Sequence, residues 1–306
     1  FLSIIEKARI QGDKAAASRA IAHMGIPLQE VLEATTFYNS IGAWKDAVDF
    51  LDFAMANGTP YSSTPMQQNA VEPFTVSPLL NYMAGWYSSQ AGDEAKALDY
   101  YGKAAAMSPD YCFPFRTEEL EMLQDVVKKN PTDWKAYYYL GNLLYYYDRK
   151  DEAIAAWQSS AELNSSYGMV FRNLGHSADK YLKDKALAAD YYAMAIKADS
   201  SDPIFFQELE DVEAALKVSS EKRLARMEKY RKTIEKSDDA TSRYVRLLLD
   251  NGKYRKALDI LETRHFRVWE GGSTVYTQFV DANLLYGLSQ LSKHRNRKAL
   301  ESFLAA

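Results

Sequence analysis

The stretch that decides the fold is residues 133–165, DWKAYYYLGNLLYYYDRKDEAIAAWQSSAELNS. Its first half carries large apolar residues three and four positions apart, which places them on one face of a helix. Gly141 in this first helix and Ala153 in a second leave room for close approach, and Trp157 supplies a large side chain one turn later. Such an antiparallel helix pair cannot bury its own apolar faces and needs neighbours on both sides.

Two further copies of this spacing flank the stretch. Gly85 is followed after 12 residues by Ala97, and Gly175 is followed after 13 residues by Ala188. Gly141 and Gly175 are 34 residues apart, which is the period of tetratricopeptide repeats. The sequence therefore predicts an all-α fold, a right-handed superhelix of tetratricopeptide-like helix pairs.

The same spacing predicts the organisation of the chain. We expect N-terminal helix pairs in 1–56, a proline-rich loop in 57–78, central repeats in 79–200 with an extra helix at 116–130, and C-terminal pairs in 201–306. The extra helix is expected to be capped by Thr117 and to end before Pro131. The last pair is expected to stop inside a repeat helix. The loop has two interpretations, a surface excursion or a segment that packs over a binding groove.

Composition argues against some classes of function. The chain has 306 residues and a net charge of −4, which argues against a nucleic-acid partner, since such a partner requires a basic face. No run of 18 apolar residues occurs, so no membrane span is expected. Cys112 is the only cysteine and allows no internal disulfide. Residue 1 is Phe, so we expect a piece or a processed product, and both cytoplasm and periplasm stay open.

The inner face of the first helices is the candidate binding groove. Residues offset from each packing glycine should point into it, and they combine aromatic rings with amide and guanidinium donors that suit a peptide or a sugar. They are Tyr82, Trp86, Tyr138, Asn142, Tyr145, Tyr146, Arg172, Asn173 and His176. The competing interpretation is plain packing, because aromatic residues between helices normally belong to the core.

A second candidate is the connection HFRVWEGG at 265–272. Its glycines permit positive φ and close approach of the backbone. Arg267, Trp269 and Glu270 would contact a partner domain or a ligand. The alternative is a rigid turn in which Trp269 fills the space between helices.

No compact catalytic signature is present. The chain has no G-x-S-x-G, H-E-x-x-H, P-loop or dinucleotide-binding glycine set. Its four histidines have no ligand spacing, so neither a metal nor a cofactor is expected. The chain alone is not expected to be a working enzyme.

Five stretches give the chain a more specific resemblance. They are DYCFPFR at 110–116, YYLGNLLYY at 138–146, FRNLG at 171–175, the acidic segment 205–211 and FRVWEGG at 266–272. Together they resemble the C-terminal tetratricopeptide half of bacterial proteins whose N-terminal half is an aldose-epimerase-like β-sandwich of unknown function. Val268 departs from that pattern, which has proline there. The resemblance implies a carbohydrate-related parent protein.

Three functions follow as hypotheses. The first is a scaffold for protein–protein or interdomain interaction, with a protein or its own N-terminal domain as partner. The second is the helical half of a sugar-active enzyme, which would contribute Arg172, Asn173, Trp269 and Glu270 to a site built mainly by the missing sandwich. The third is a free-standing adaptor that binds peptides.

Overall fold

The computed structural model describes residues 2–24, 27–58, 77–110, 112–267 and 274–306. These residues form 18 α-helices and contain no β-strand, which confirms the prediction of an all-α helical repeat. The chain divides into two compact units, Phe1–Asn164 and Ser165–Ala306, and each is described by itself. The division falls inside the predicted central block 79–200. Most of the predicted loop at 57–78 lies outside the described residues.

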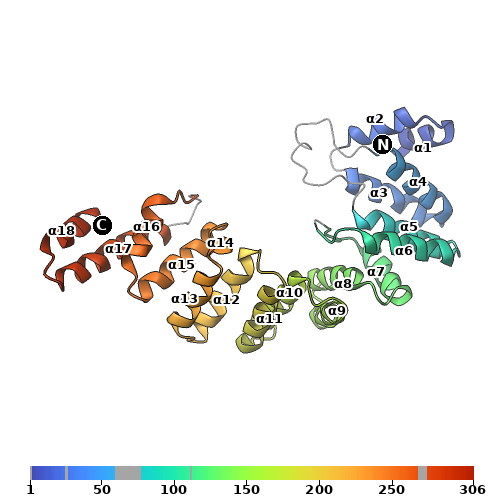
Figure 1. Ribbon diagram of the computed structural model, residues 1–306. Coiled ribbons are helices and arrows are strands. Elements are labelled where there is room, and N and C mark those ends of the chain that lie inside the picture. Colours follow the sequence, from blue (N-terminus) through green and yellow to red (C-terminus); the bar gives the residue numbers. More distant parts are fainter. Residues whose placement is uncertain (1, 25–26, 59–76, 111, 268–273) are drawn as a thin grey trace. The chain divides into compact units, whose positions relative to one another are not determined.

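Unit 1 is a series of antiparallel helix pairs (Figure 1). Its helices are α1 (Leu2–Gln11), α2 (Lys14–Ala22), α3 (Pro27–Ser40), α4 (Trp44–Asn57), α5 (Pro78–Gln90), α6 (Glu94–Ala106), α7 (Thr117–Lys129), α8 (Trp134–Tyr146) and α9 (Lys150–Leu163). The pairs α5/α6 and α8/α9 are the repeats expected around Gly85 and Gly141. The extra helix α7 lies between them and packs against both α5 and α8.

The packing glycines have the role that the sequence predicts. A Cβ atom built on Gly141 would overlap the indole of Trp157, and one on Gly85 would overlap the ring of Tyr101. In unit 2, a Cβ on Gly175 would lie 2.8 Å from ring carbons of Tyr192. Because only glycine leaves room for these rings, the first helix and the second approach closely in each of these pairs.

The start of α7 differs from the expectation. Thr117 is the first helical residue rather than the cap. The buried carboxylate of Glu119 accepts hydrogen bonds from the backbone N–H groups of Phe115 (2.6 Å) and Arg116 (2.8 Å). It also pairs with the Arg116 guanidinium at 3.0 Å. A carboxylate with several donors satisfies the helix start more completely than a threonine hydroxyl would.

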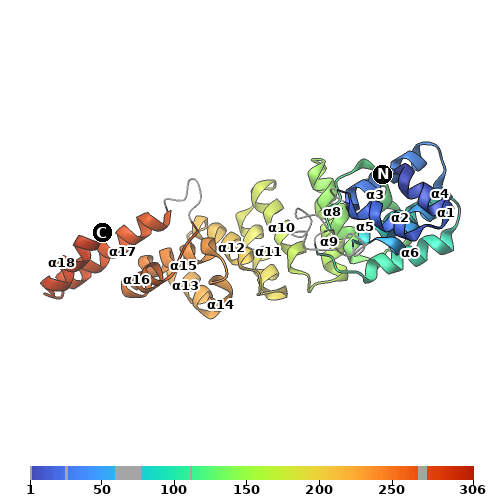
Figure 2. The same cartoon turned by 90° about the horizontal axis from the view of Figure 1, so that it is seen from above.

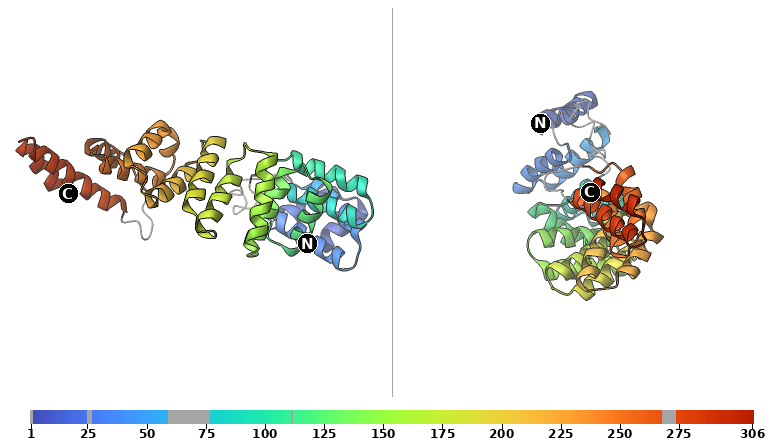
Figure 3. Two further views of the ribbon diagram at one scale, coloured as in Figure 1. Left: turned by 90° about the horizontal axis from the view of Figure 1, so that it is seen from below. Right: turned by 90° about the vertical axis from the view of Figure 1, so that its left-hand side faces the viewer.

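Unit 2 continues the pattern of helix pairs (Figure 2). Its helices are α10 (Gly168–Lys180), α11 (Lys185–Ala198), α12 (Pro203–Ala215), α13 (Ser220–Lys229), α14 (Arg231–Ile234), α15 (Asp238–Asp250), α16 (Tyr254–Thr263), α17 (Thr274–Leu291) and α18 (Asn296–Ala305). The last two, drawn in red, lie side by side as an antiparallel pair (Figure 3). After α12 the helical path is interrupted at Tyr230, which separates α13 from the short α14.

One pair in unit 2 departs from close packing. In α5, α8 and α10 the packing glycine is the eighth residue after the N-cap, whereas in α12 that position holds Glu210. Glu210 pairs with Arg223 of α13, 13 residues later, which is the spacing of Gly175 and Ala188. In this pair Glu210 and Arg223 thus occupy the two positions that a glycine and an alanine hold in the pairs that begin with α5, α8 and α10.

Within the described part of the chain, no helix has both the length and the apolar character needed to cross a membrane.

Candidate functional site

The expectation of an open aromatic groove is wrong for Tyr82, Trp86 and Tyr138, whose side chains are buried. The Tyr82 ring meets the Tyr139 ring edge-on, and Tyr138 also packs against Tyr139. Trp86 packs against Tyr87. The physical reason is that the neighbouring helices cover these positions, so the rings join the core, as the packing interpretation held.

Asn142 and Tyr145 are half-buried and support the packing of their own repeat. The Trp157 indole N–H donates to the Asn142 side-chain oxygen at 3.0 Å, and the Tyr145 ring lies 5.3 Å from that of Trp157. Both residues therefore hold the ring that fills the space beside Gly141. Tyr146, by contrast, is 70% exposed. A ligand role for these residues stays a prediction.

Arg172, Asn173 and His176 lie on α10 in unit 2 and are half-buried. The guanidinium of Arg172 forks onto the carboxylate of Glu208, with its Nε 2.9 and 3.0 Å from the two oxygens. Burial, and next the charge of Arg172, lower the pKa of His176. This favours the neutral form of the His176 imidazole.

The pair Arg172–Glu208 is the first step of a series. Glu208 and Asp211 are three residues apart on α12, so they share a face, as Arg243 and Arg246 do on α15. Asp211 accepts from Arg243 at 2.7 and 2.8 Å. Arg246 in turn lies 3.8 Å from Asp281 of α17 and 3.2 Å from Asp250 of its own helix.

We name this set the charge ladder: Arg172, Glu208, Asp211, Arg243, Arg246 and Asp281. It joins the first helices of successive pairs, and its sign alternates from basic α10 through acidic α12 and basic α15 to acidic α17. The Arg172 and Glu208 side chains at one end are 29% and 19% exposed, whereas those of the other four residues, which we call its outer half, are between 32% and 60% exposed. The outer half is therefore accessible from solvent.

Sequence reasoning found only Arg172 among these six residues. The sequence pattern that could have identified the others is a pair of like charges that recurs with the opposite sign one repeat later. Acidic residues at 208 and 211 are followed 35 positions later by arginines at 243 and 246. Opposite charges one repeat apart at matching positions of first helices predict contacts between neighbouring repeats.

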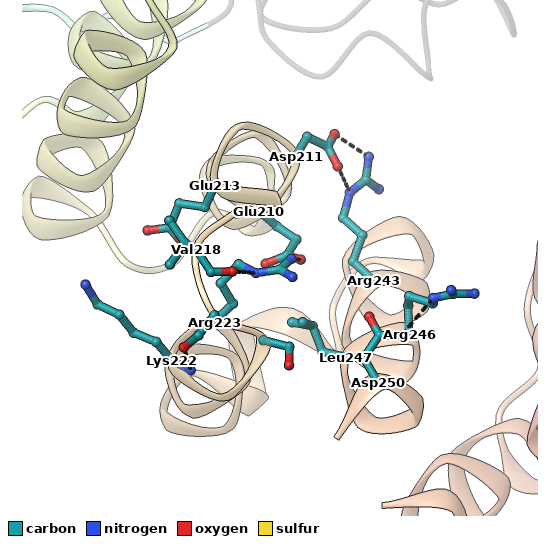
Figure 4. A network of polar contacts seen from close by, with 12 residues as sticks. Glu210, Asp211, Glu213, Val218, Lys222, Arg223, Arg243, Arg246, Leu247 and Asp250 are labelled. Atoms are coloured by element: carbon teal, nitrogen blue, oxygen red, sulfur yellow. Dashed lines mark hydrogen bonds and ion pairs between the residues drawn. The ribbon is translucent and has the colours of Figure 1, made fainter. Parts of the chain in front are cut away.

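The opposite side of α12 carries a second polar cluster, and Figure 4 shows part of it together with Asp211, Arg243 and Arg246 of the ladder. Glu210 accepts from Arg223, whose Nε donates to the Val218 carbonyl at 3.0 Å, and Glu213 pairs with Arg226 at 2.8 Å. The second oxygen of Glu210 is buried and has no hydrogen-bond partner among the described residues. Burial raises the pKa of Glu210 to about 7, although both arginines lower it. This cluster belongs to the interface between α12 and α13.

The connection after α16 is described only in part. Arg267 is exposed, and its backbone N–H donates to Asp238 at 2.9 Å. That bond, together with Arg264, lowers the pKa of Asp238. Trp269 and Glu270 lie outside the described residues, so their expected role stays a prediction. Across the parts of the chain described above, no three His, Cys, Asp or Glu side chains gather as metal ligands.

No protein-family model matches the chain. Among solved structures, YrrB, described as a TPR protein with an unusual peptide-binding site, is 21% identical over 60% of this chain and 89% of its own, with a TM-score of 0.44. PilF of Pseudomonas aeruginosa is 15% identical over 95% of this chain and 98% of its own, with a TM-score of 0.38. MamA is 17% identical over 64% of this chain and 95% of its own, with a TM-score of 0.30. At such TM-scores these similarities carry no argument, and the repeat fold rests on the helix pairs and packing glycines above.

Proposed function

We propose that the chain is a helical-repeat scaffold that binds protein partners through the charge ladder of unit 2. The observation that supports this is the alternation of sign across four successive first helices, with the outer half accessible. Complementary charge patterns fix the register of a partner and speed its association. A partner segment with the opposite alternation would match the ladder one charge at a time.

The ladder can exchange its internal pairs for contacts with a partner. The Asp211 carboxylate is 58% exposed and Arg243 is 32% exposed. Exposed ion pairs contribute about 0–1 kcal/mol to stability. Opening such a pair to admit a charged partner therefore costs little, and the new pair would be less hydrated.

The test compares two charge reversals. The ladder variant carries Arg243→Glu and Arg246→Glu together. The control carries Arg255→Glu on the second helix α16, where Arg255 pairs with Asp259 and Glu262 of the same helix. Each purified chain is immobilised, exposed to extract of its source organism at low and high salt, and the retained proteins are quantified by mass spectrometry.

We expect proteins retained by the natural chain and by the control to be lost from the ladder variant, and to be released by salt. Retention of the same proteins by all three chains would exclude the ladder as the binding face. Circular dichroism of the variants checks that the helices are intact.

A carbohydrate role takes second place in this proposal. It rests on the resemblance to proteins with an aldose-epimerase-like half, and two of its four proposed residues, Trp269 and Glu270, lie outside the described residues. Arg172 is engaged by Glu208. Turnover of aryl glycosides or epimerisation of aldoses by this chain alone would promote this function over the scaffold.

A further inference from the structure

The turns between the first and second helices of unit 2 carry exposed lysines. Lys183 lies between α10 and α11, Lys217 between α12 and α13, and Lys293 between α17 and α18. None of the three forms an ion pair within the described part of the chain. In the fourth turn, between α15 and α16, Lys253 pairs with Glu228 instead. Three of the four turns therefore offer a positive charge that no carboxylate of unit 2 neutralises by direct contact.

These turns lie along one edge of unit 2, because its first helices run in the same direction. Each first helix contacts the next at two points, which follow the same order along both. The contacts are Gly168 with Phe205 and Arg172 with Glu208, then Gln207 with Ser237 and Asp211 with Arg243, then Ser242 with Gln278 and Arg246 with Asp281. Helices packed in this way end on the same side, so the turns that follow them form a row.

Two of the lysines adopt a backbone conformation that favours glycine. The angle φ is 59° at Lys183 and 60° at Lys217, whereas the turns after α5 and α15 place Gly92 and Gly252 in the left-handed region. A lysine in this region costs free energy relative to glycine, because its Cβ approaches the following carbonyl. No ion pair of these side chains offsets that cost within the described residues. The fold would thus be better served by glycine, which indicates that the lysines act on something outside the chain.

Positive charge is concentrated at this edge although the chain as a whole has a net charge of −4. Residues 292–298, SKHRNRK, hold four lysines and arginines and no acidic residue. Arg297 pairs with Glu301, and the other three have no acidic partner among the described residues. At the opposite edge, the connection between α11 and α12 carries Asp199 and Asp202. A polyanion would therefore be attracted to the edge formed by the turns.

Two of the lysines directly follow exposed leucines. Leu182, before Lys183, is 47% exposed, and Leu216, before Lys217, is 41% exposed. A cation beside an apolar side chain at the tip of a turn fits the interface of a bilayer. There the ammonium group meets lipid phosphate, and the leucine enters the boundary of the acyl chains. An acidic protein segment would need the charges but gives no reason for the leucines beside them, so the combination favours a membrane surface.

We propose that this row of turns, which we call the basic edge, binds the surface of a membrane that contains anionic phospholipids. The basic edge consists of Leu182, Lys183, Leu216, Lys217, Lys293 and Lys298. None of these residues belongs to the charge ladder, so a protein partner and a membrane would contact separate side chains. Contacts from several turns act together, because each lysine near an anionic surface adds its own attraction.

The experiment measures cosedimentation of the full chain with vesicles of phosphatidylcholine and with vesicles that also contain phosphatidylserine. We expect binding only to the second kind, weakened by high salt. Lys183→Glu with Lys217→Glu should weaken binding by roughly tenfold or more. The matched control is Lys197→Glu with Lys232→Glu, which changes the net charge equally at two exposed lysines of α11 and α14 that lie outside the basic edge. The control should bind as the natural chain does.

Two further variants separate the membrane contact from charge and from folding. Leu182→Ser should weaken binding to phosphatidylserine vesicles, whereas Met194→Ser, at a residue of α11 that is 44% exposed, should not. Lys183→Gly with Lys217→Gly should raise the melting temperature, because glycine relieves the left-handed backbone, and should still weaken binding.

Four results would overturn the proposal. They are equal binding to both kinds of vesicle or to neither, equal effects of the two lysine pairs, unchanged binding of the glycine variant, and equal effects of the Leu182 and Met194 substitutions. Binding to soluble polyglutamate without binding to vesicles would likewise reject a membrane and assign the basic edge to an acidic protein partner.

Discussion

The hydroxyl of Tyr82 in α5 donates a hydrogen bond to the carboxylate of Asp133, 2.7 Å away and 51 residues later in the chain. Asp133 also accepts from the backbone N–H groups of Lys135 (3.1 Å) and Ala136 (3.2 Å), and so caps α8. A single buried carboxylate thus joins the first helix of one repeat to the start of the first helix of the next. Burial raises the pKa of Asp133 even though these donors lower it.

We predict that Tyr82→Phe lowers the free energy of unfolding of the chain by about 1–2 kcal/mol, since a buried carboxylate loses one of its donors. Urea denaturation followed by circular dichroism measures the change. Tyr146→Phe is the matched control, because that side chain is 70% exposed, and it should change stability by less than about 0.5 kcal/mol. Equal effects of the two substitutions would show that the Tyr82 hydroxyl contributes nothing specific.

The packing glycines give a second pair of variants. Gly141→Ala places a methyl group against the rigid indole of Trp157, so we expect a loss of about 1–3 kcal/mol. Gly102 lies within helix α6, and nothing lies within 4 Å of the position that a methyl group would take there. At Gly102 alanine should stabilise the chain by about 0.5–1 kcal/mol through its higher helix propensity. Thermal unfolding should therefore show a lower melting temperature for Gly141→Ala and a higher one for Gly102→Ala. A stabilised Gly141→Ala would contradict the close approach of α8 and α9.

The contrast between Gly141 and Tyr82 explains how much of the fold the sequence could predict. Gly141, Ala153 and Trp157 lie within one repeat, so their spacing alone identifies the pair they pack. Tyr82 meets a residue of a later repeat, across the inserted helix α7, and no local spacing marks that contact. The helix pairs were therefore predictable, whereas the sequence left both a groove and core packing open for the aromatic residues, because contacts between repeats decide between them.

The candidate site was predicted only in part for a related reason. Arg172 stood out as a single charge in a distinctive segment, but its partner Glu208 is 36 positions away. The ladder depends on how neighbouring repeats align side by side, and that alignment follows from packing between repeats.

The ion pair at the centre of α12 and α13 predicts a dependence on pH. Burial raises the pKa of Glu210 to about 7 from 4.5. An acid whose folded-state pKa exceeds its unfolded one binds more protons when folded between these two values. Its contribution to stability is therefore fully present below about pH 4.5 and is lost as the pH rises through about 7.

Glu210→Gln isolates this contribution because glutamine does not titrate. We expect the difference in unfolding free energy between the natural chain and the variant to shift by roughly 1–3 kcal/mol in favour of glutamine between pH 5 and pH 8. Urea titrations at several pH values measure it. A difference that stays constant, or that shifts in favour of glutamate as the pH rises, would mean that the arginines hold Glu210 ionised throughout.

The last prediction concerns the contribution of an ion pair of the charge ladder to the stability of the fold. The side chains of Arg172 and Glu208 are 29% and 19% exposed, whereas those of Arg255 and Asp259 on α16 are 54% and 57% exposed. Double-mutant cycles to alanine should give a coupling of about 1–2 kcal/mol for the first pair, which forms a two-pronged contact between repeats. The second pair, four residues apart on one exposed helix, should give about 0.3–0.5 kcal/mol. High salt should remove most of the second coupling and leave most of the first, because screening acts mainly on exposed charges. If both couplings were small and equally sensitive to salt, the ladder would be a set of independent surface pairs rather than a link between repeats.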